Sequence, residues 1–254
     1  MTIGGIDFSA ILPFIGVGFA AQLVDGALGM AFGVISNTLL VGVMGVPPAL
    51  ASQRVHVVEC FTTATSGISH LLHGNIDKRL FFRLLVPGMI GGLLGAYVLT
   101  SLDAAVVKPF VLLYLSCIGL YILMRGLFYP PKIKEAKLIA PLGLFGGFLD
   151  AAGGGGWGPV VTSNLLIQGA DPRKVVGTVN SVEFFLTLTV SAAFIFQLGF
   201  ADLAGATLGL LIGGLLAAPL GAWAAKHFPP KQMLILVGIV LTITSAYGVW
   251  KAWG

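Results

Sequence analysis

Four acidic side chains lie deep inside apolar stretches of this 254-residue sequence, namely Asp25, Glu59, Asp150 and Glu183. A charged group at the centre of a membrane helix costs at least ~2.5–3.5 kcal/mol, so such residues are rare and usually serve a function. In membrane proteins these carboxyl groups mark ion pathways or take up and release protons. The four acids are therefore the first candidates for a substrate or ion site.

Two of these acids belong to polar stripes with the spacing of a helix face. The first stripe contains His56, Glu59, Thr63 and Gly67, and the second contains Asn180, Glu183, Thr187 and Ser191. Lipid does not solvate such faces, so both stripes should face the interior of a helix bundle. His56 and Asn180 are thus expected at the site, with His56 as a member of a proton relay or as a packing residue. The alternative for the two glutamates is that they only join helices through hydrogen bonds.

The composition predicts what kind of protein positions these residues. Hydrophobic residues make up 57% of the chain, charged residues only 9%, and the mean hydropathy is +0.98. A soluble domain cannot bury so much apolar surface, so we expect an all-α polytopic membrane protein with about eight to ten helical segments. The net charge of +4 does not indicate nucleic-acid binding, because Lys and Arg are enriched in cytoplasmic loops.

Polar landmarks recur in the same order in the two halves of the chain, which indicates an internal repeat. The matching pairs are Ser36-Asn37 with Ser163-Asn164, His56-x-x-Glu59 with Asn180-x-x-Glu183, and Gly95-Ala96-Tyr97 with Gly221-Ala222-Trp223. We expect a first transmembrane repeat over 1–129, a cytoplasmic linker over 130–139 and a second transmembrane repeat over 140–254.

The first apolar run of each repeat is interrupted. In the second repeat, the glycines around Gly153–Gly156 break the run 140–168, which predicts two helical arms of nine residues, Pro141–Leu149 and Val160–Gln168. Each arm would rise roughly 13 Å, about half of the bilayer core. We therefore expect a hairpin with its tip at the bilayer midplane, either re-entrant or made of two short crossings. Asp25-Gly26-Ala27-Leu28-Gly29 takes the same place in the first repeat.

The positions of the cations favour hairpins that return to the side from which they entered. With returning hairpins, eleven of the 14 Lys and Arg residues share one side, and only Arg54, Lys108 and Lys251 lie on the other. The positive-inside rule then places the eleven in the cytoplasm and both termini outside it. Each half crosses the membrane an odd number of times, so the halves have inverted topology, as in many secondary transporters.

The hairpins provide further candidates for the site. The second arm of each begins at the tip, so its N–H groups, near Gly155 and Gly156 in the second repeat, would point inward and bind an anion. Polar residues farther along the arms would line the path, namely Ser36, Asn37, Ser163 and Asn164. Trp157 either forms a wall of the cavity or packs in the core. Arg54 either attracts an anion or is a helix-end residue whose charge reaches the interface.

Several motifs resemble the sulfite exporter TauE/SafE family, also called the four-toluene sulfonate uptake permease family. They are Gly153-Gly154-Gly155-Gly156-Trp157-Gly158-Pro159, the later Gly177-Thr178, and Gly74-Asn75-Ile76-Asp77. The resemblance covers essentially the whole chain and adds Thr178 to the candidate site. In the first repeat Gln53-Arg54 replaces the Gly-Thr pair. The resemblance implies transport of sulfur-containing anions, such as sulfite, sulfoacetate or other sulfonates, across a bacterial inner membrane.

Acids beside an anionic substrate must carry protons or pair with cations. We therefore expect a proton-coupled anion transporter whose partners are the small anion, protons and the lipid bilayer. The alternative is a divalent-cation transporter that uses the same acids. We expect no enzyme, because no nucleophile or HExxH pattern accompanies His56 and Glu59. We expect no cofactor and no resident metal, because the glycine run lacks the features of a nucleotide loop and the histidines are widely spaced.

Overall fold

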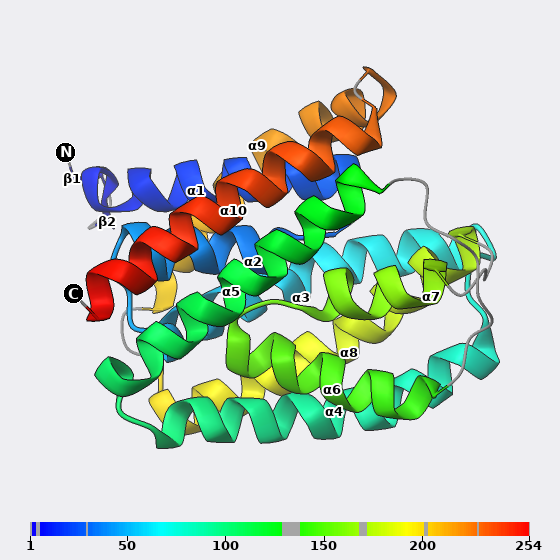
Figure 1. Ribbon diagram of the computed structural model, residues 1–254, viewed down its shortest axis with the longest axis horizontal. Helices are drawn as coiled ribbons and strands as arrows, with labels where there is room; N and C mark the ends of the chain where they lie inside the picture. The colour runs from blue at the N-terminus through cyan, green and yellow to red at the C-terminus, as the bar shows by residue number, and fades with distance from the viewer. Residues whose placement is uncertain are drawn as a thin grey trace.

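The computed structural model describes residues 2–3, 6–28, 30–128, 138–167, 172–200, 203–227 and 229–253. Most of the predicted linker, 130–137, lies outside these residues. A short antiparallel pairing joins β1 (Thr2–Ile3) to β2 (Ile6–Asp7) near the N-terminus. Nearly all of the remaining described residues are helical (Figure 1).

The long helices follow one another in the same order in each half, but the second arm of the hairpin runs from α-helix to π-helix in the first half and from π-helix to α-helix in the second. The first half has α1 (Phe8–Leu28), α2 (Phe32–Asn37), the π-helical η1 (Thr38–Val43), α3 (Pro48–Leu72), α4 (Lys78–Ser101) and α5 (Ala104–Leu127). The second half has α6 (Ile139–Gly153), the π-helical η2 (Trp157–Thr162), α7 (Ser163–Ile167), α8 (Pro172–Leu198), α9 (Leu203–His227) and α10 (Pro230–Trp253). Each half therefore begins with a broken helical hairpin and continues with three long helices.

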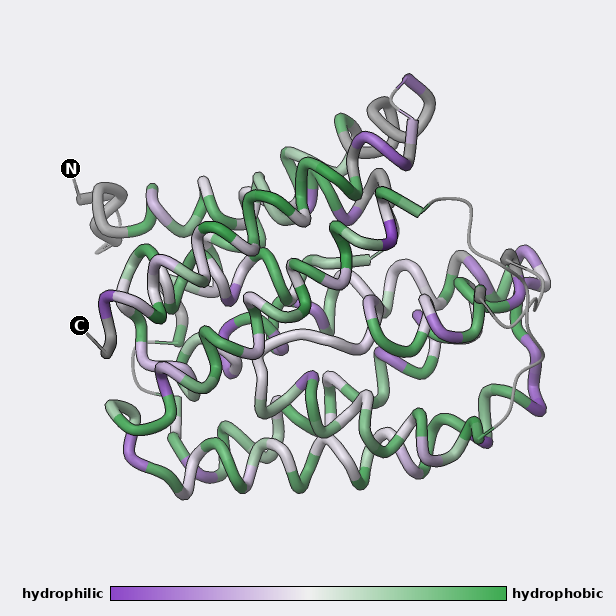
Figure 2. The backbone as a smooth tube through the Cα atoms, viewed as in Figure 1, coloured by the Kyte–Doolittle hydropathy of each residue, from purple (hydrophilic) through white to green (hydrophobic). Residues whose placement is uncertain are grey.

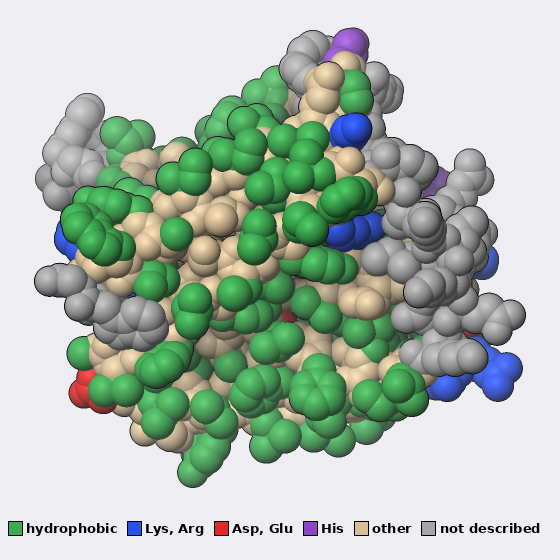
Figure 3. Space-filling view, viewed as in Figure 1, with side chains coloured by type: hydrophobic (Ala, Val, Ile, Leu, Met, Phe, Trp, Pro, Cys, Tyr) green, Lys and Arg blue, Asp and Glu red, His purple; other side chains and the backbone are tan. Residues whose placement is uncertain are grey.

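The apolar character of the long helices confirms an all-α membrane protein. Within the described residues, four stretches are long and apolar enough to cross a bilayer: Lys78–Ser101, Ala104–Leu127, Lys174–Leu198 and Leu234–Lys251. The long helices consist mainly of hydrophobic residues (Figure 2), and apolar side chains cover much of the face in Figure 3. Phe196, for example, is 92% exposed. Such a surface suits lipid, while the backbone polar groups are satisfied inside the helices.

The main helix contacts join one half of the chain to the other. Helix α1 packs on α9, α4 on α6, α3 on α8 and α5 on α10. Glycine makes the first two contacts close: the backbone of Leu144 on α6 leaves no room for a side chain at Gly91 on α4, and that of Ile15 on α1 leaves none at Gly213 on α9. In lipid, where burial of apolar surface does not drive association, this close packing contributes much of the stability.

Each hairpin starts and ends at one end of the molecule (Figure 1). The first hairpin begins with α1 and finishes with η1 on the side of the molecule that holds both termini. The second hairpin begins with α6 and finishes with α7 on the opposite side. The first arm of the second hairpin has 15 residues, not the nine predicted. The helix continues past Asp150 because glycine interrupts it only at Gly154, where the backbone turns to a positive φ of 76°.

Candidate functional site

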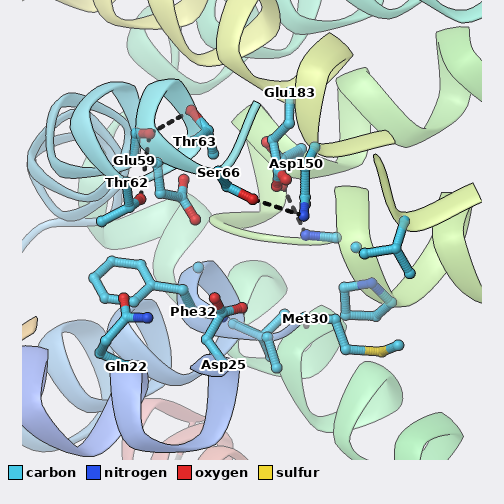
Figure 4. A pocket seen from close by; sticks show the side chains of 18 of the residues that line it. Gln22, Asp25, Met30, Phe32, Glu59, Thr62, Thr63, Ser66, Asp150 and Glu183 are labelled. Atoms are coloured by element: carbon cyan, nitrogen blue, oxygen red, sulfur yellow. Dashed lines mark hydrogen bonds between the residues drawn. The ribbon is translucent and has the colours of Figure 1, made fainter. Parts of the chain in front are cut away.

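A polar cavity of about 290 Å³ lies between the two hairpins and helices α3 and α8. All four acids singled out in the sequence line it. Figure 4 shows the carboxyl groups of Asp25, Glu59 and Glu183 approaching the same space from three different helices. The other polar lining residues are Gln22, Thr62, Thr63, Ser66, His70 and Asn180.

The tips of the two hairpins meet backbone to backbone beside this cavity. A Cβ added to Gly155 would collide with the backbone of Gly33 and Val34, and one added to Gly158 would lie 3.0 Å from the Cβ of Met30. Gly155 also has a φ of 131°, a conformation that only glycine adopts readily. The glycine run is therefore required by the close approach of the two chains.

Each hairpin tip is held by an aspartate seven residues before the start of its second arm. Oδ1 of Asp150 accepts hydrogen bonds from the N–H groups of Gly156 at 2.9 Å and Trp157 at 3.0 Å. Oδ1 of Asp25 accepts one from the N–H of Phe32 at 3.3 Å. These N–H groups, proposed from the sequence as anion ligands, thus already bond the chain's own carboxylates.

His56 connects helix α3 to the second of these aspartates. Its Nδ1 lies 2.8 Å from the backbone oxygen and 3.3 Å from the Oγ of Ser52. Its Nε2 lies 3.1 Å from Oδ2 of Asp150. The contact joins the two side chains by a hydrogen bond. His56 and Asp150 are both buried, at 1% and 4% exposure.

Glu59 and Glu183 differ from the aspartates. Neither glutamate carboxyl receives a hydrogen bond from the described residues, whereas both aspartates accept backbone N–H bonds. The hydroxyls of Thr62 and Thr63 donate instead to the backbone oxygen of Glu59. Oε1 of Glu59 points at the first hairpin, where it would lie 3.1 Å from a Cβ added to Gly33. These two carboxyl groups are free to interact with what enters the cavity.

The cavity lacks fixed positive charge in the part of the chain that the structure describes. None of its described lining residues is Lys or Arg, and His70 is the one basic side chain among them. Nor do three or more His, Cys, Asp or Glu side chains in the described ranges come close enough to hold a metal ion.

Several predicted site residues lie outside the cavity lining. The side-chain amides of Asn37 and Asn164 donate to the backbone oxygens of Gly33 at 3.1 Å and Val160 at 2.7 Å, one turn back on their own arms. Ser163 lies against the sulfur of Met30, and Ser36 is buried in the same arm as Asn37. These four residues lie within the arms and do not line the cavity.

Arg54, Trp157 and Thr178 also pack away from the cavity. The guanidinium of Arg54 lies 5.7 Å from the centre of the Phe14 ring on α1. Trp157 is fully buried, and its Nε1 donates to the backbone oxygen of Val179 at 3.2 Å. Oγ1 of Thr178 accepts from the N–H of Asp77 at 2.8 Å and so fastens the α3–α4 turn. Of the two alternatives for Trp157, the structure favours packing.

Some lining residues were not among the predicted site residues. Thr62, Ser66 and His70 lie three, seven and eleven residues after Glu59, and Gln22 lies three residues before Asp25. All four therefore share a helix face with a buried acid. A search for polar residues on the helix face of each buried acid would have found them.

Comparison with known proteins agrees with this description. The family model for the sulfite exporter TauE/SafE matches residues 14–248. The chain is 43% identical over 252 residues to the probable membrane transporter protein YtnM of Bacillus subtilis, an alignment that covers 96% of this chain and 84% of that protein. It is 24% identical over 259 residues to a probable membrane transporter protein of Haemophilus influenzae, with 96% of each chain covered.

No solved structure matches the chain. The family match and the two relatives concern membrane transporters, which agrees with the prediction that the chain is not an enzyme. The match to the family model spans nearly the whole sequence, including both hairpins and both polar helices. The chain is therefore a multi-pass membrane transporter that belongs to the sulfite exporter TauE/SafE family.

Proposed function

We propose that this chain is a secondary transporter that moves small sulfur-containing anions, such as sulfite, sulfoacetate or other sulfonates, together with protons. The observation that carries the proposal is the pair of glutamate carboxyls, Glu59 and Glu183, which face a cavity lined by no described Lys or Arg. The substrate class comes from the name of the family, and a bacterial inner membrane is the expected location.

Electrostatics links the anion to protons. A carboxylate and an anion about 4 Å apart repel each other by about 4 kcal/mol at an effective dielectric constant of 20. Protonation of Glu59 or Glu183 removes this repulsion and adds an O–H donor for an oxygen of the substrate. The anion and the proton therefore favour each other's binding, which is the thermodynamic basis of coupled transport.

An inverted repeat is part of this proposal. Two observations support it: in both halves a hairpin is followed by three long helices, and the hairpins return to opposite ends of the molecule (Figure 1). The proposed repeats span 1–129 and 140–254, with 130–139 as the linker between them. On the face in Figure 3, most Lys and Arg side chains lie at the end where α4 begins. That end is the proposed cytoplasmic side, which puts both termini outside the cytoplasm.

Uptake into proteoliposomes tests the role of the glutamates. We expect Glu59→Gln and Glu183→Gln to abolish sulfite uptake driven by a pH gradient. Asp103→Asn is the matched control, because Asp103 caps α5 by accepting from the N–H of Ala105, and an asparagine oxygen can do the same. Unchanged pH-driven uptake in both glutamine variants, with the control also active, would refute proton coupling through these residues.

A divalent-cation carrier is the second candidate. It is favoured by the gathering of four acids around one cavity without described Lys or Arg. Against it, the described His, Cys, Asp and Glu side chains do not come together as a metal site. Calorimetry with Mn²⁺ on the purified protein separates the two candidates. Binding that disappears in Asp25→Asn or Glu59→Gln would favour the cation carrier over the anion transporter.

A further inference from the structure

The cavity opens along only one half of the antiparallel pair α3 and α8. On α3 it is lined from Glu59 to His70, and on α8 from Val176 to Glu183. Toward the opposite end of the pair the side chains are packed. All residues from Ala51 to His56 are buried, and so are Thr187 and Phe194.

The packed half is nevertheless polar. Ser52, His56 and Thr187 are at most 1% exposed, yet none of them lines the cavity. Burial of a hydroxyl or imidazole in a membrane protein is costly and needs hydrogen-bond partners. Polar side chains can join two membrane helices through hydrogen bonds, but the Thr187 hydroxyl donates within its own helix, to the backbone oxygen of Phe184 at 3.1 Å. A polar stripe that continues past the cavity is therefore suited to a surface that meets water in another conformation.

Residues of α3 and α8 that match each other in the internal repeat line the cavity at one end of the helix pair and pack together at the other end. The offset that matches Glu59 with Glu183 also matches His56 with Asn180 and His70 with Phe194. At the open end, Asn180 and His70 both line the cavity. At the packed end, the rings of His56 and Phe194 lie against each other, with centroids 6.0 Å apart.

Three further contacts hold the packed end together. Oγ of Ser52 donates to the backbone oxygen of Ala151 at 3.0 Å, next to the His56–Asp150 contact. Nε2 of Gln53 donates to the backbone oxygen of Gly199, in the α8–α9 turn, at 2.9 Å. Sγ of Cys60 lies 3.4 Å from Oγ of Ser191 on α8. These contacts join α3 to α6 and to α8, so they must separate for this end to open.

We infer that His56 and Phe194 form a closed gate, and that Ser52, His56, Thr187 and Phe194 line the second half of the substrate path when this gate opens. The inference rests on the proposed transport function, and it assigns the route by which substrate reaches the side of the membrane that holds the termini. When the end at His56 and Phe194 opens, the end at His70 and Asn180 closes. The first pair then lines the path, and the second pair is packed. Glu59 and Glu183 remain accessible in both conformations, because they lie where the two halves of the path meet.

A disulfide tests whether this end must open. In a Cys117→Ala background, Ser191→Cys places a second thiol beside the native Cys60, within reach of a disulfide. Oxidation should stop sulfite uptake and reduction should restore it, each compared with the same protein before treatment. Cys60→Ala with Ser191→Cys is the matched control and should not respond to the oxidant. Full uptake by protein shown by mass spectrometry to carry the bond would overturn the gate.

Thiol labelling provides a measurement that needs no knowledge of the substrate. In a Cys60→Ala, Cys117→Ala background, a membrane-impermeant maleimide should reach Ser66→Cys from the side of the α3–α4 turn. It should reach Thr187→Cys only from the side of the termini. If sulfite is not carried but this pattern appears, the gate holds and the substrate is wrong. Labelling of Thr187→Cys from the α3–α4 side alone, or from neither side, would overturn the gate.

Discussion

Nε2 of His56 lies 3.1 Å from Oδ2 of Asp150, and this contact connects helix α3 to the tip of the second hairpin. The other oxygen of Asp150 holds the N–H groups of Gly156 and Trp157. One carboxyl group therefore fixes both the shape of the tip and its position relative to α3. A movement of α3 at this level must either move the tip or break the contact.

Substitution of Asp150 should separate its hydrogen-bonding role from its charge. Asp150→Ala leaves two N–H groups and the His56 ring without their partner, each at a cost of ~1–3 kcal/mol. Asp150→Asn keeps an oxygen for the N–H groups, and its amide can donate to Nε2. We expect thermal unfolding in detergent to show a large loss of stability for the alanine variant and a small one for the asparagine variant. Equal losses would show that the charge itself holds the tip.

Asp25 should behave as a tip residue and not as a proton carrier. Its Oδ1 accepts from the N–H of Phe32 at 3.3 Å, a bond that an asparagine oxygen can replace. We expect Asp25→Asn to retain pH-driven uptake in proteoliposomes under conditions where Glu59→Gln has lost it. Loss of the pH response in Asp25→Asn, with normal protein yield and stability, would place Asp25 in the proton path.

Gly155 should not tolerate a side chain. Alanine there would collide with the backbone of Gly33 and Val34 and would hold a φ of 131°. Crowding of this kind costs ~1–3 kcal/mol, and the backbone conformation adds to it. Gly16→Ala on α1 is the control, since nothing lies within 4 Å of the added Cβ, and helix propensity there favours alanine by about 1 kcal/mol. A melting temperature that falls equally in both variants would contradict the close contact of the tips.

The orientation in the membrane can be measured at two exposed turns. In a background without Cys60 and Cys117, we expect His73→Cys, after α3, to react with an impermeant thiol reagent only from the cytoplasm. Leu102→Cys, between α4 and α5, should react only from the other side, because the intervening α4 has 24 residues and crosses once. The opposite pattern would reverse the assignment of the termini.

The sequence predicted the long helices and the meeting of the four acids better than the details of the site. The composition predicted a bundle of membrane helices, because so much apolar surface needs lipid around it. Helical spacing placed Glu59 and Glu183 on inward faces, because lipid does not solvate a polar stripe. The predicted length of the α6 arm was wrong. A glycine-rich stretch can remain helical when a neighbouring helix packs closely against it, as α4 does here.

Contacts between distant parts of the chain could not be read from spacing. His56 and Asp150 are 94 residues apart, and nothing in either local sequence indicates that they pair. The aspartates that occupy the tip N–H groups act over seven residues through a turn, which is not a familiar capping pattern. Arg54 was expected to attract an anion, but whether it lies on Phe14 or on the cavity depends on how α1 packs.

Because helices of the first half pack against helices of the second, the order of synthesis matters for folding. Helix α1 ends at Leu28, but its packing partner α9 begins only at Leu203, about 175 residues later. At ~5–20 residues per second, the ribosome needs roughly 9 to 35 s to supply that partner. During this time the face of α1 that will contact α9 lies beside lipid or the insertion machinery. The first half therefore cannot complete its fold during synthesis, and truncation before α9 should leave α1 as a target for membrane proteases.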